Sequence, residues 1–247
     1  MKVALIGYGK MGRLLEARLL EKGHEVLALV DPNYQEGIPL DSLRSLGLDV
    51  AIEYTTPSVA VENILFCVRE KIPVVTGTTG WYEKLPEIEK AVNDAGSSLL
   101  WASNFSLGVN LFYRIAAHAA KLIDPFPEYD VAGLEIHHNK KADSPSGTAK
   151  ILVERVLAQM SRKKKAVYHM LEKPPAADEI HYASLRLGSV PGNHSLVFDS
   201  TADTIEISHT ARSREGFAAG TVLAAEWLVG KKRSGVFGID DVLKELL

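Results

Sequence analysis

Hydrophobic and polar positions over the first hundred residues alternate between two patterns. Short continuous apolar runs, such as residues 3–6 and 26–30, are typical of parallel strands that are buried on both faces. Between these runs, apolar residues recur every three or four positions, which predicts amphipathic helices. Strands that alternate with helices favour a doubly wound parallel sheet of the α/β class. We predict strands at 3–6, 25–30, 50–54, 73–76 and 98–102, and helices at 11–21, 58–71 and 83–95.

The pattern changes after about residue 104. A long helix is predicted over residues 107–123 and a strand over residues 129–137, with Glu135 and His137 on one face of that strand. Three strand-like segments then follow with few helices between them, which indicates a mixed or antiparallel sheet and therefore a second domain, of the α+β class. These segments are 181–187, 195–199 and 203–211, and further helices are predicted at 148–160, 217–229 and 239–247.

The composition is that of an ordinary globular protein. Of the 247 residues, 46% are hydrophobic and 24% are charged, and the formal net charge of -3 gives no sign of nucleic-acid binding. The dense basic cluster at residues 162–165 is interpreted as a solvated turn after a helix. The single cysteine, Cys67, lies in an apolar run and is expected to be a buried structural thiol. With no membrane-spanning stretch and no signal peptide, we expect a cytoplasmic protein that binds neither membranes nor nucleic acid.

A glycine-rich loop lies between the first predicted strand and the first predicted helix. Its spacing fits G-x-G-x-x-G: Gly7 permits a tight turn, Gly9 lets the backbone approach a pyrophosphate, and Gly12 allows the helix to pack closely on the strand. The free N–H groups at the start of the helix would also favour phosphate. The loop therefore predicts a Rossmann-type dinucleotide site rather than a purely structural turn. The candidate contacts are Gly7, Tyr8, Gly9, Lys10, Met11 and Gly12.

Asp31 ends the second predicted strand, 19 residues after Gly12. An acid at this position usually accepts a hydrogen bond from the ribose 2′-hydroxyl, which favours NADH. The cations Lys10 and Arg13 could instead attract the 2′-phosphate of NADPH. The alternative is that Asp31 only forms a turn with Pro32. We therefore expect NADH, NADPH or both.

A second group of small residues, Gly77, Thr78 and Thr79, follows the strand at 73–76. The carboxyl ends of the strands form the ligand crevice of a doubly wound sheet, so backbone groups here could reach a nicotinamide. The alternative is a flexible turn. We include the three residues among the candidate cofactor contacts.

The segment from Glu135 to Ala149 carries the richest chemistry. His137 and His138 can act as acid or base near neutral pH, and Lys141 can stabilise developing negative charge or deliver a proton. Ser146 opens a helix whose first amides can hold a carboxylate, although it could equally be a plain cap. A metal pair is disfavoured because adjacent strand residues point to opposite faces, and no nucleophile elbow surrounds Ser146. We predict no metal and an anionic substrate that is reduced and protonated.

This segment resembles the signature of dihydrodipicolinate reductases, which read approximately E-x-H-H-x-x-K-x-D-x-P-S-G-T-A. The resemblance continues at residues 9–13, 77–80 and 102–110 and in the late segment around Ser213 and Arg214, so that it covers essentially the whole chain. It implies that His137 is the general acid/base and that Lys141 is a proton donor. It implies substrate binding by His138, Ser146, Gly147 and Thr148, and nicotinamide contacts by Ala102, Ser103, Asn104 and Phe105.

The resemblance also implies an activity and an assembly. The reaction would be NADH- or NADPH-dependent reduction of 4-hydroxy-tetrahydrodipicolinate, via dihydrodipicolinate, to tetrahydrodipicolinate in lysine and diaminopimelate biosynthesis. We expect a dinucleotide-binding domain at residues 1–103 and 217–247. Residues 104–216 would bind the dicarboxylate substrate and form a homotetramer. From the residues alone, another Rossmann-type dehydrogenase of a small carboxylate or a non-catalytic nucleotide sensor stays open.

The chain departs from the family pattern in three places. Its first glycine loop is one residue shorter than the common Gly-x-x-Gly-x-Met-Gly form, and Asp31 lacks the basic neighbour of NADPH-preferring members. Residues 189–194 replace a frequent Gly-Asp-x-x-Gly-Glu-His type of loop. The first two departures leave the cofactor preference open.

Overall fold

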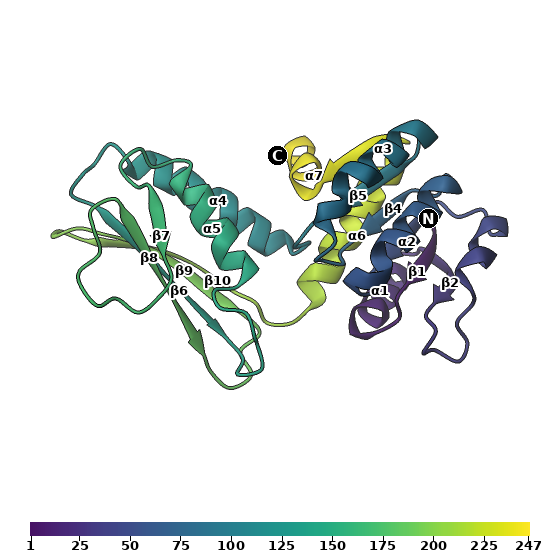
Figure 1. The fold of residues 1–247 in the computed structure, drawn as a ribbon, viewed down its shortest axis with the longest axis horizontal. Coiled ribbons are helices and arrows are strands. Elements are labelled where there is room, and N and C mark those ends of the chain that lie inside the picture. Colours follow the sequence, from purple (N-terminus) through teal and green to yellow (C-terminus); the bar gives the residue numbers. More distant parts are fainter. The chain divides into compact units, whose positions relative to one another are not determined.

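The computed structural model describes residues 1–247 and divides into two compact units. Unit 1 comprises Met1–Leu107 and Arg214–Leu247, and unit 2 comprises Gly108–Ser213. The chain therefore leaves unit 1 after Leu107 and returns to it at Arg214 (Figure 1). The assignment of cofactor binding to one unit and of substrate binding to the other stays a prediction.

Unit 1 is built on a six-stranded sheet with the strand order β11-β5-β4-β3-β1-β2. Every neighbouring pair is parallel, as the continuous apolar runs predict. The strand that sequence reasoning missed is β11, whose four residues include a glycine at each end and give no recognisable strand pattern. The strands are β1 (Lys2–Ile6), β2 (Glu25–Val30), β3 (Val50–Glu53), β4 (Val74–Thr76), β5 (Ser98–Trp101) and β11 (Gly235–Gly238).

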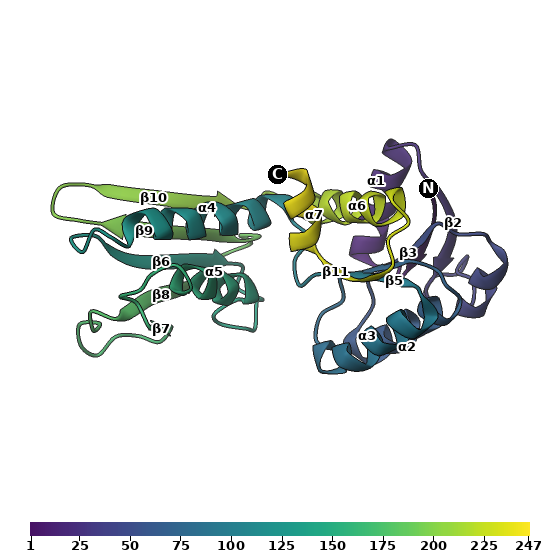
Figure 2. The ribbon, with the colours of Figure 1, turned by 90° about the horizontal axis from the view of Figure 1, so that it is seen from above.

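Helices cover both faces of this sheet, which makes it doubly wound (Figure 2). Alternate residues of β1 point to opposite faces: Leu5 packs with α1, α6 and α7, whereas Ile6 packs with α2 and α3. Cys67 on α2 is fully buried, as predicted, and burial raises the pKa of its thiol to about 12. The helices are α1 (Lys10–Glu21), α2 (Pro57–Arg69), α3 (Leu85–Ala95), α6 (Glu215–Gly230) and α7 (Ile239–Leu246), with short 3-10 turns η1 (Leu40–Ser45) and η2 (Tyr82–Lys84).

Unit 2 contains a five-stranded mixed sheet with the order β10-β9-β6-β8-β7. The central strand β6 is parallel to β8 and antiparallel to β9, so the predicted mixed sheet is confirmed. Helices α4 (Leu107–Ile123) and α5 (Gly147–Leu157) pack on one face through a shared apolar core, and the other face carries no helix (Figure 1). The strands are β6 (Asp130–His137), β7 (Lys165–Val167), β8 (Glu179–Arg186), β9 (Asn193–Asp199) and β10 (Thr204–Thr210).

None of the helices in the chain is long and apolar enough to cross a membrane.

The basic cluster at residues 162–165 is only partly the solvated turn that was predicted. The Lys163 side chain is 2% exposed, and its Nζ lies 2.6 Å from Asp130 Oδ1. The same ammonium group donates to the carbonyl oxygen of Glu179 at 2.8 Å. The prediction was therefore wrong for Lys163, which links the starts of β6 and β8, because a buried cation needs such partners.

Glycine 220 allows helix α6 to lie against the backbone of the segment after β5. A Cβ on Gly220 would overlap the carbonyl oxygen of Phe105. Gly220→Ala should therefore lower the free energy of unfolding by about 1–3 kcal/mol, because overpacking forces the backbone to move. Urea unfolding of the full chain measures this change.

Gly230→Ala is the matched control on the same helix, because a Cβ there meets nothing within 4 Å. It should be neutral or stabilising by up to about 1 kcal/mol. Equal effects of the two substitutions would show that the close approach at Gly220 does not hold α6 in place.

Candidate active site

The glycine loop of unit 1 has the local geometry of a phosphate site. Gly7 adopts a φ of +93°, and a Cβ there would overlap the carbonyl oxygen of Tyr54, so only glycine fits the turn. A Cβ on Gly12 would overlap the carbonyl oxygen of Gly7, which keeps α1 close to β1. In contrast, Gly9 faces open space, and no side chain caps the first turn of α1. The residues therefore fit a pyrophosphate that accepts from the uncapped amides.

Asp31 is tied to the glycine loop. Its Oδ2 accepts a hydrogen bond from the backbone N–H of Tyr8 at 2.7 Å, and its Oδ1 accepts from the N–H of Asn33 at 2.8 Å. The turn-forming alternative is thus real, and the predicted ribose contact stays a prediction. Beside it, the Arg13 guanidinium lies 4.7 Å from the Tyr8 ring centroid and 5.8 Å from that of Tyr34. Tyr34 was not among the predicted cofactor contacts. Lys10, which was among them, is exposed at the start of α1.

Six of the predicted cofactor residues line one small cavity of about 190 Å³. Tyr54, at the end of β3, was missed, although its position after a parallel strand is the same signal that identified Gly77. The Tyr54 hydroxyl lies 2.7 Å from Thr221 Oγ1, and Gly77 leaves room for its ring. The cavity is lined by Met11, Tyr54, Gly77, Ala102, Ser103, Asn104, Phe105, Arg214 and Phe217.

The threonines after β4 lie in different surroundings. Thr78 is buried, and its hydroxyl donates to Glu53 Oε1 at 3.0 Å and accepts from the N–H of Thr55 at 2.8 Å. Its side chain therefore organises the loops at the strand ends. Thr79 is exposed, and the predicted cofactor contacts of both residues stay predictions.

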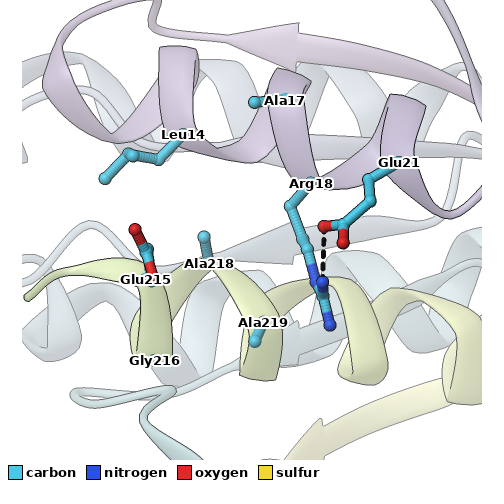
Figure 3. Close-up of a pocket in the computed structure, with 8 residues that line it drawn as sticks. All are labelled: Leu14, Ala17, Arg18, Glu21, Glu215, Gly216, Ala218 and Ala219. Carbon is cyan, nitrogen blue, oxygen red and sulfur yellow. Dashed lines mark hydrogen bonds and ion pairs between the residues drawn. The ribbon is translucent and has the colours of Figure 1, made fainter.

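A larger cavity, of about 400 Å³, lies between α1 and α6 and contains none of the predicted site residues (Figure 3). Small side chains such as Ala17, Ala218 and Ala219 leave the space between the helices. Its charged residues include Arg18 and Glu21, which form an ion pair with an N–O distance of 2.5 Å. The cavity holds none of the histidine, lysine and serine residues singled out above, and the Glu21 carboxylate is paired with Arg18, so we do not consider it an active-site candidate.

The chemistry predicted for residues 135–149 gathers in unit 2 where β6 ends and α5 begins. Ser146 is the N-cap of α5, and its Oγ accepts from the N–H of Ala149 at 3.1 Å, so the capping prediction is confirmed. The Ser146 hydroxyl also donates to Glu135, which leaves it engaged within the protein. Gly147 is exposed at the first turn of α5, and a Cβ there would meet nothing within 4 Å. Thr148 and His138 are half-buried nearby in the chain, and substrate binding by these residues stays a prediction.

His137 is buried beside a carboxylate. Its Nδ1 lies 3.4 Å from Glu135 Oε2, and its ring is edge-on to that of His194 with 5.2 Å between centroids. Burial lowers the pKa of His137 below its usual value, and the charges of Lys141 and Arg186 add to this effect, whereas Glu135 opposes it. The imidazole is therefore mainly neutral at neutral pH.

Lys141 occupies the loop that follows His137. Its Nζ lies 2.8 Å from Asp143 Oδ1, and its side chain is 22% exposed, so the ammonium group is both oriented and accessible. The hydrogen bond from Lys141 also holds the pKa of Asp143 below its usual value. Arg186 donates to the backbone carbonyl of Asp143 at 2.5 Å, which ties this loop to the end of β8.

Glu135, His137 and His194 place three possible metal ligand atoms within 4.8 Å of one another. The carboxylate, however, already accepts from Ser146 and Ser184 and lies 3.3 Å from the Arg186 guanidinium. The Arg186 cation beside this carboxylate repels a metal ion and disfavours one there. The cluster is better described as a hydrogen-bonded acid/base network.

A doubly wound sheet with an open glycine loop, in one chain with this acid/base network, defines a nucleotide-dependent oxidoreductase. The family model described as "Dihydrodipicolinate reductase, N-terminus" matches residues 1–105, and its C-terminal counterpart matches residues 108–243. The chain belongs to the dihydrodipicolinate reductase family. The predicted family, and with it the prediction of an NADH- or NADPH-dependent reductase, is confirmed.

Relatives align with the chain from end to end. The 4-hydroxy-tetrahydrodipicolinate reductase of Christiangramia forsetii is 39% identical over 246 residues, which cover 100% of this chain and 99% of the relative. The enzyme of the same name from Staphylococcus aureus is 34% identical over 251 residues, with 98% and 100% covered. The similarity is therefore not confined to the nucleotide-binding part.

Solved structures support the fold. The dipicolinate-bound dihydrodipicolinate reductase from Paenisporosarcina sp. TG-14 is 24% identical, with a TM-score of 0.78 and coverage of 96% of this chain and 97% of that one. A myo-inositol 2-dehydrogenase from Lactobacillus plantarum is 13% identical, with a TM-score of 0.62 and coverage of 100% and 94%. At these identities the likeness shows the architecture alone.

The geometry at Asp31 predicts how cofactor choice can be changed. Asp31→Asn keeps an oxygen that can accept from a loop amide but removes the negative charge. We expect the ratio of kcat/KM for NADPH to that for NADH to rise roughly tenfold, about 1.4 kcal/mol, because a repulsion with the 2′-phosphate is lost. Steady-state kinetics with both cofactors measure the ratio.

Asp41→Asn serves as the control, since Asp41 is an exposed acid of η1 paired with Arg44. It removes the same charge from unit 1 and should leave the ratio unchanged. If Asp31→Asn also leaves it unchanged, Asp31 does not read the ribose.

Proposed function

We propose that this chain reduces 4-hydroxy-tetrahydrodipicolinate, via dihydrodipicolinate, to tetrahydrodipicolinate with NADH or NADPH. The reaction belongs to lysine and diaminopimelate biosynthesis, and we propose that the enzyme is cytoplasmic. The observation that carries the proposal is the acid/base network of unit 2, where His137, Lys141 and the start of α5 meet the needs of a dicarboxylate that gains a hydride and a proton.

Substrate binding follows from charge. The first turn of α5, where Gly147 is exposed and Thr148 is half-buried, presents amide N–H groups and the positive end of the helix dipole, both suited to a carboxylate. His138 would add a further contact to the carboxylates. The Ser146 hydroxyl contributes indirectly, because it caps α5 and thereby fixes the orientation of these amides.

The protein's part in the reaction is to hold charge and to move a proton. When bound, NADH or NADPH supplies the hydride. Hydride addition places negative charge on the conjugated ring of the substrate. Lys141 stabilises this charge, and the substrate receives its proton from Lys141 or from the imidazolium form of His137, whose Nε2 must first take up a proton. The ion pair with Asp143 keeps the Lys141 ammonium group in place for this step.

The direct test is an assay with substrate made in situ from pyruvate and aspartate semialdehyde. The purified chain should oxidise NADH, NADPH or both, followed by the loss of nicotinamide absorbance at 340 nm. Oxidation of neither cofactor under conditions where a related reductase is active would overturn the proposed function. Omission of aspartate semialdehyde controls for background oxidation.

Lys141→Ala should reduce kcat by roughly 10²–10³-fold, because one group that stabilises charge in the transition state is removed. The affinity for NADH should change little, since Lys141 belongs to unit 2 and the glycine loop to unit 1. Stopped-flow or steady-state kinetics give the first value, and fluorescence titration with NADH gives the second.

The adjacent Lys140 provides the matched control, because it is exposed and carries the same charge. Lys140→Ala should retain activity within about threefold, as expected for an exposed surface charge. A near-normal kcat for Lys141→Ala, or an equal loss for Lys140→Ala, would contradict the assigned role.

We also propose a homotetramer that assembles through the sheet face of unit 2 without helices. On that face, Leu134, Leu185 and Val197 form an apolar strip with the neighbouring alanines, and Leu185 is 51% exposed. Exposed apolar strips of this kind support an interface between subunits. Light scattering should give a particle of four chains, and Leu185→Asp should reduce its size.

The control for this prediction is Leu122→Asp, which places the same charge at a leucine of α4 that is 59% exposed. It should leave the assembly intact. A monomeric wild-type protein would exclude the tetramer.

A further inference from the structure

Glu135 is fully buried, yet none of the roles described above uses it. It lies on β6 two residues before His137, and both side chains share one face of the strand. We propose that Glu135 is a positioning residue that holds His137 with its hydrogen on Nδ1, which leaves Nε2 as the atom that exchanges a proton with the substrate. This inference rests on the proposed function and adds the residue that prepares His137 for it.

The surroundings of His137 Nδ1 restrict its partner. The atom is buried and makes no hydrogen bond of ordinary length, and Glu135 Oε2, at 3.4 Å, is the carboxylate oxygen that faces it. A carboxylate can only accept, so the hydrogen of a neutral His137 belongs on Nδ1. His194 does not compete for this role, because its own Nδ1 lies 3.1 Å from the Tyr182 hydroxyl.

Glu135 is kept ionised by its neighbours. Burial alone would raise the pKa of this carboxyl group, but hydrogen bonds from Ser146 and Ser184 outweigh burial and hold the pKa below its usual value. Oε1 accepts from the Ser146 N–H at 3.0 Å and from Ser184 Oγ at 2.9 Å, with Arg186 Nη2 at 3.3 Å. The carboxylate is thus a permanent acceptor and a permanent negative charge beside the imidazole.

The same carboxylate also fixes the start of α5. Both the backbone N–H and the hydroxyl of Ser146 donate to it, and Ser146 is the residue that caps α5. One group therefore sets the position of the proton carrier and of the amides at Gly147 and Thr148 proposed to hold the substrate carboxylate. A shift of either relative to the other would separate binding from proton transfer.

Several charged or titratable groups face His137, from three strands and a loop. Glu135 on β6 favours the imidazolium, whereas Lys141 in the following loop and Arg186 on β8 disfavour it. His194 on β9 faces the ring edge-on, with 5.2 Å between centroids. Asp143, in the same loop, favours it weakly. Removal of the Glu135 charge should therefore lower the pKa of His137 further and shift its limb of the pH–rate profile to lower pH.

The first test needs no substrate and no variant of Glu135. In the full-length protein with ¹⁵N-labelled histidine, long-range ¹H–¹⁵N spectra distinguish a protonated from an unprotonated ring nitrogen. The signals of His137 are those that disappear in His137→Gln. At a pH where the ring is neutral, we expect a protonated Nδ1 and an unprotonated Nε2. A neutral ring with its hydrogen on Nε2 would overturn the proposal.

The second test uses Glu135→Gln, whose amide group would place a donor near Nδ1 if its oxygen keeps the contacts to Ser146 and Arg186. We expect the hydrogen of His137 to move to Nε2 and the pH limb to shift downward. We also expect kcat to fall by roughly 10²-fold, the lower range for a lost acid/base contribution, with NADH affinity unchanged. An unchanged tautomer together with an unchanged pH profile would overturn the proposal.

Two further variants complete the design. Glu135→Asp keeps the charge and should retain the wild-type tautomer with a smaller loss of kcat, so it decides the question if Glu135→Gln does not fold. Glu154→Gln removes an exposed carboxylate from α5 and should match the wild type in every readout. If the wild-type chain shows the expected tautomer but no turnover, the proposed function fails while the positioning role of Glu135 stands.

Discussion

A carboxylate that is fully buried at the end of a strand must be surrounded by donors, and this requirement organises both units. In unit 1, Glu53 at the end of β3 accepts from Thr55, Thr76 and Thr78. In unit 2, Glu135 near the end of β6 accepts from serines on the neighbouring elements. Because a buried charge without such partners would be very costly, the loops that supply the donors are held where function needs them.

The architecture could be predicted from the sequence because its signals are local. Continuous apolar runs identified the parallel strands of unit 1, and the loop from Gly7 to Gly12 lay between the strand and helix that give it meaning. The strands β7 and β11 were missed, because segments of three or four residues that include glycines or a lysine are too short to show a pattern of hydrophobic positions. They form only because long partner strands offer an edge with which to pair.

The site was predicted less completely, because the residues that were not predicted contact it from segments that are distant in sequence. His137, Lys141 and Ser146 lie in one short segment and could be grouped by reading it. Arg186 and Ser184 approach this segment only because β8 lies beside β6 in the sheet. Lys163 was predicted to be a solvated surface lysine because its partners are also distant in sequence: Asp130 and Glu179 begin two other strands.

The division between the two units explains where specificity lies. In its glycine loop, unit 1 presents mainly backbone groups and glycines. Such groups suit any dinucleotide, and they recur throughout this fold. Unit 2 presents side chains whose charges are individually arranged: an imidazole against a carboxylate, an ammonium group against a carboxylate, and a capped helix start. Hydride chemistry comes with the cofactor, so what distinguishes one reductase from another is where charge and protons are placed. In this chain that placement depends on Glu135, which holds the imidazole and the helix start with a single carboxylate.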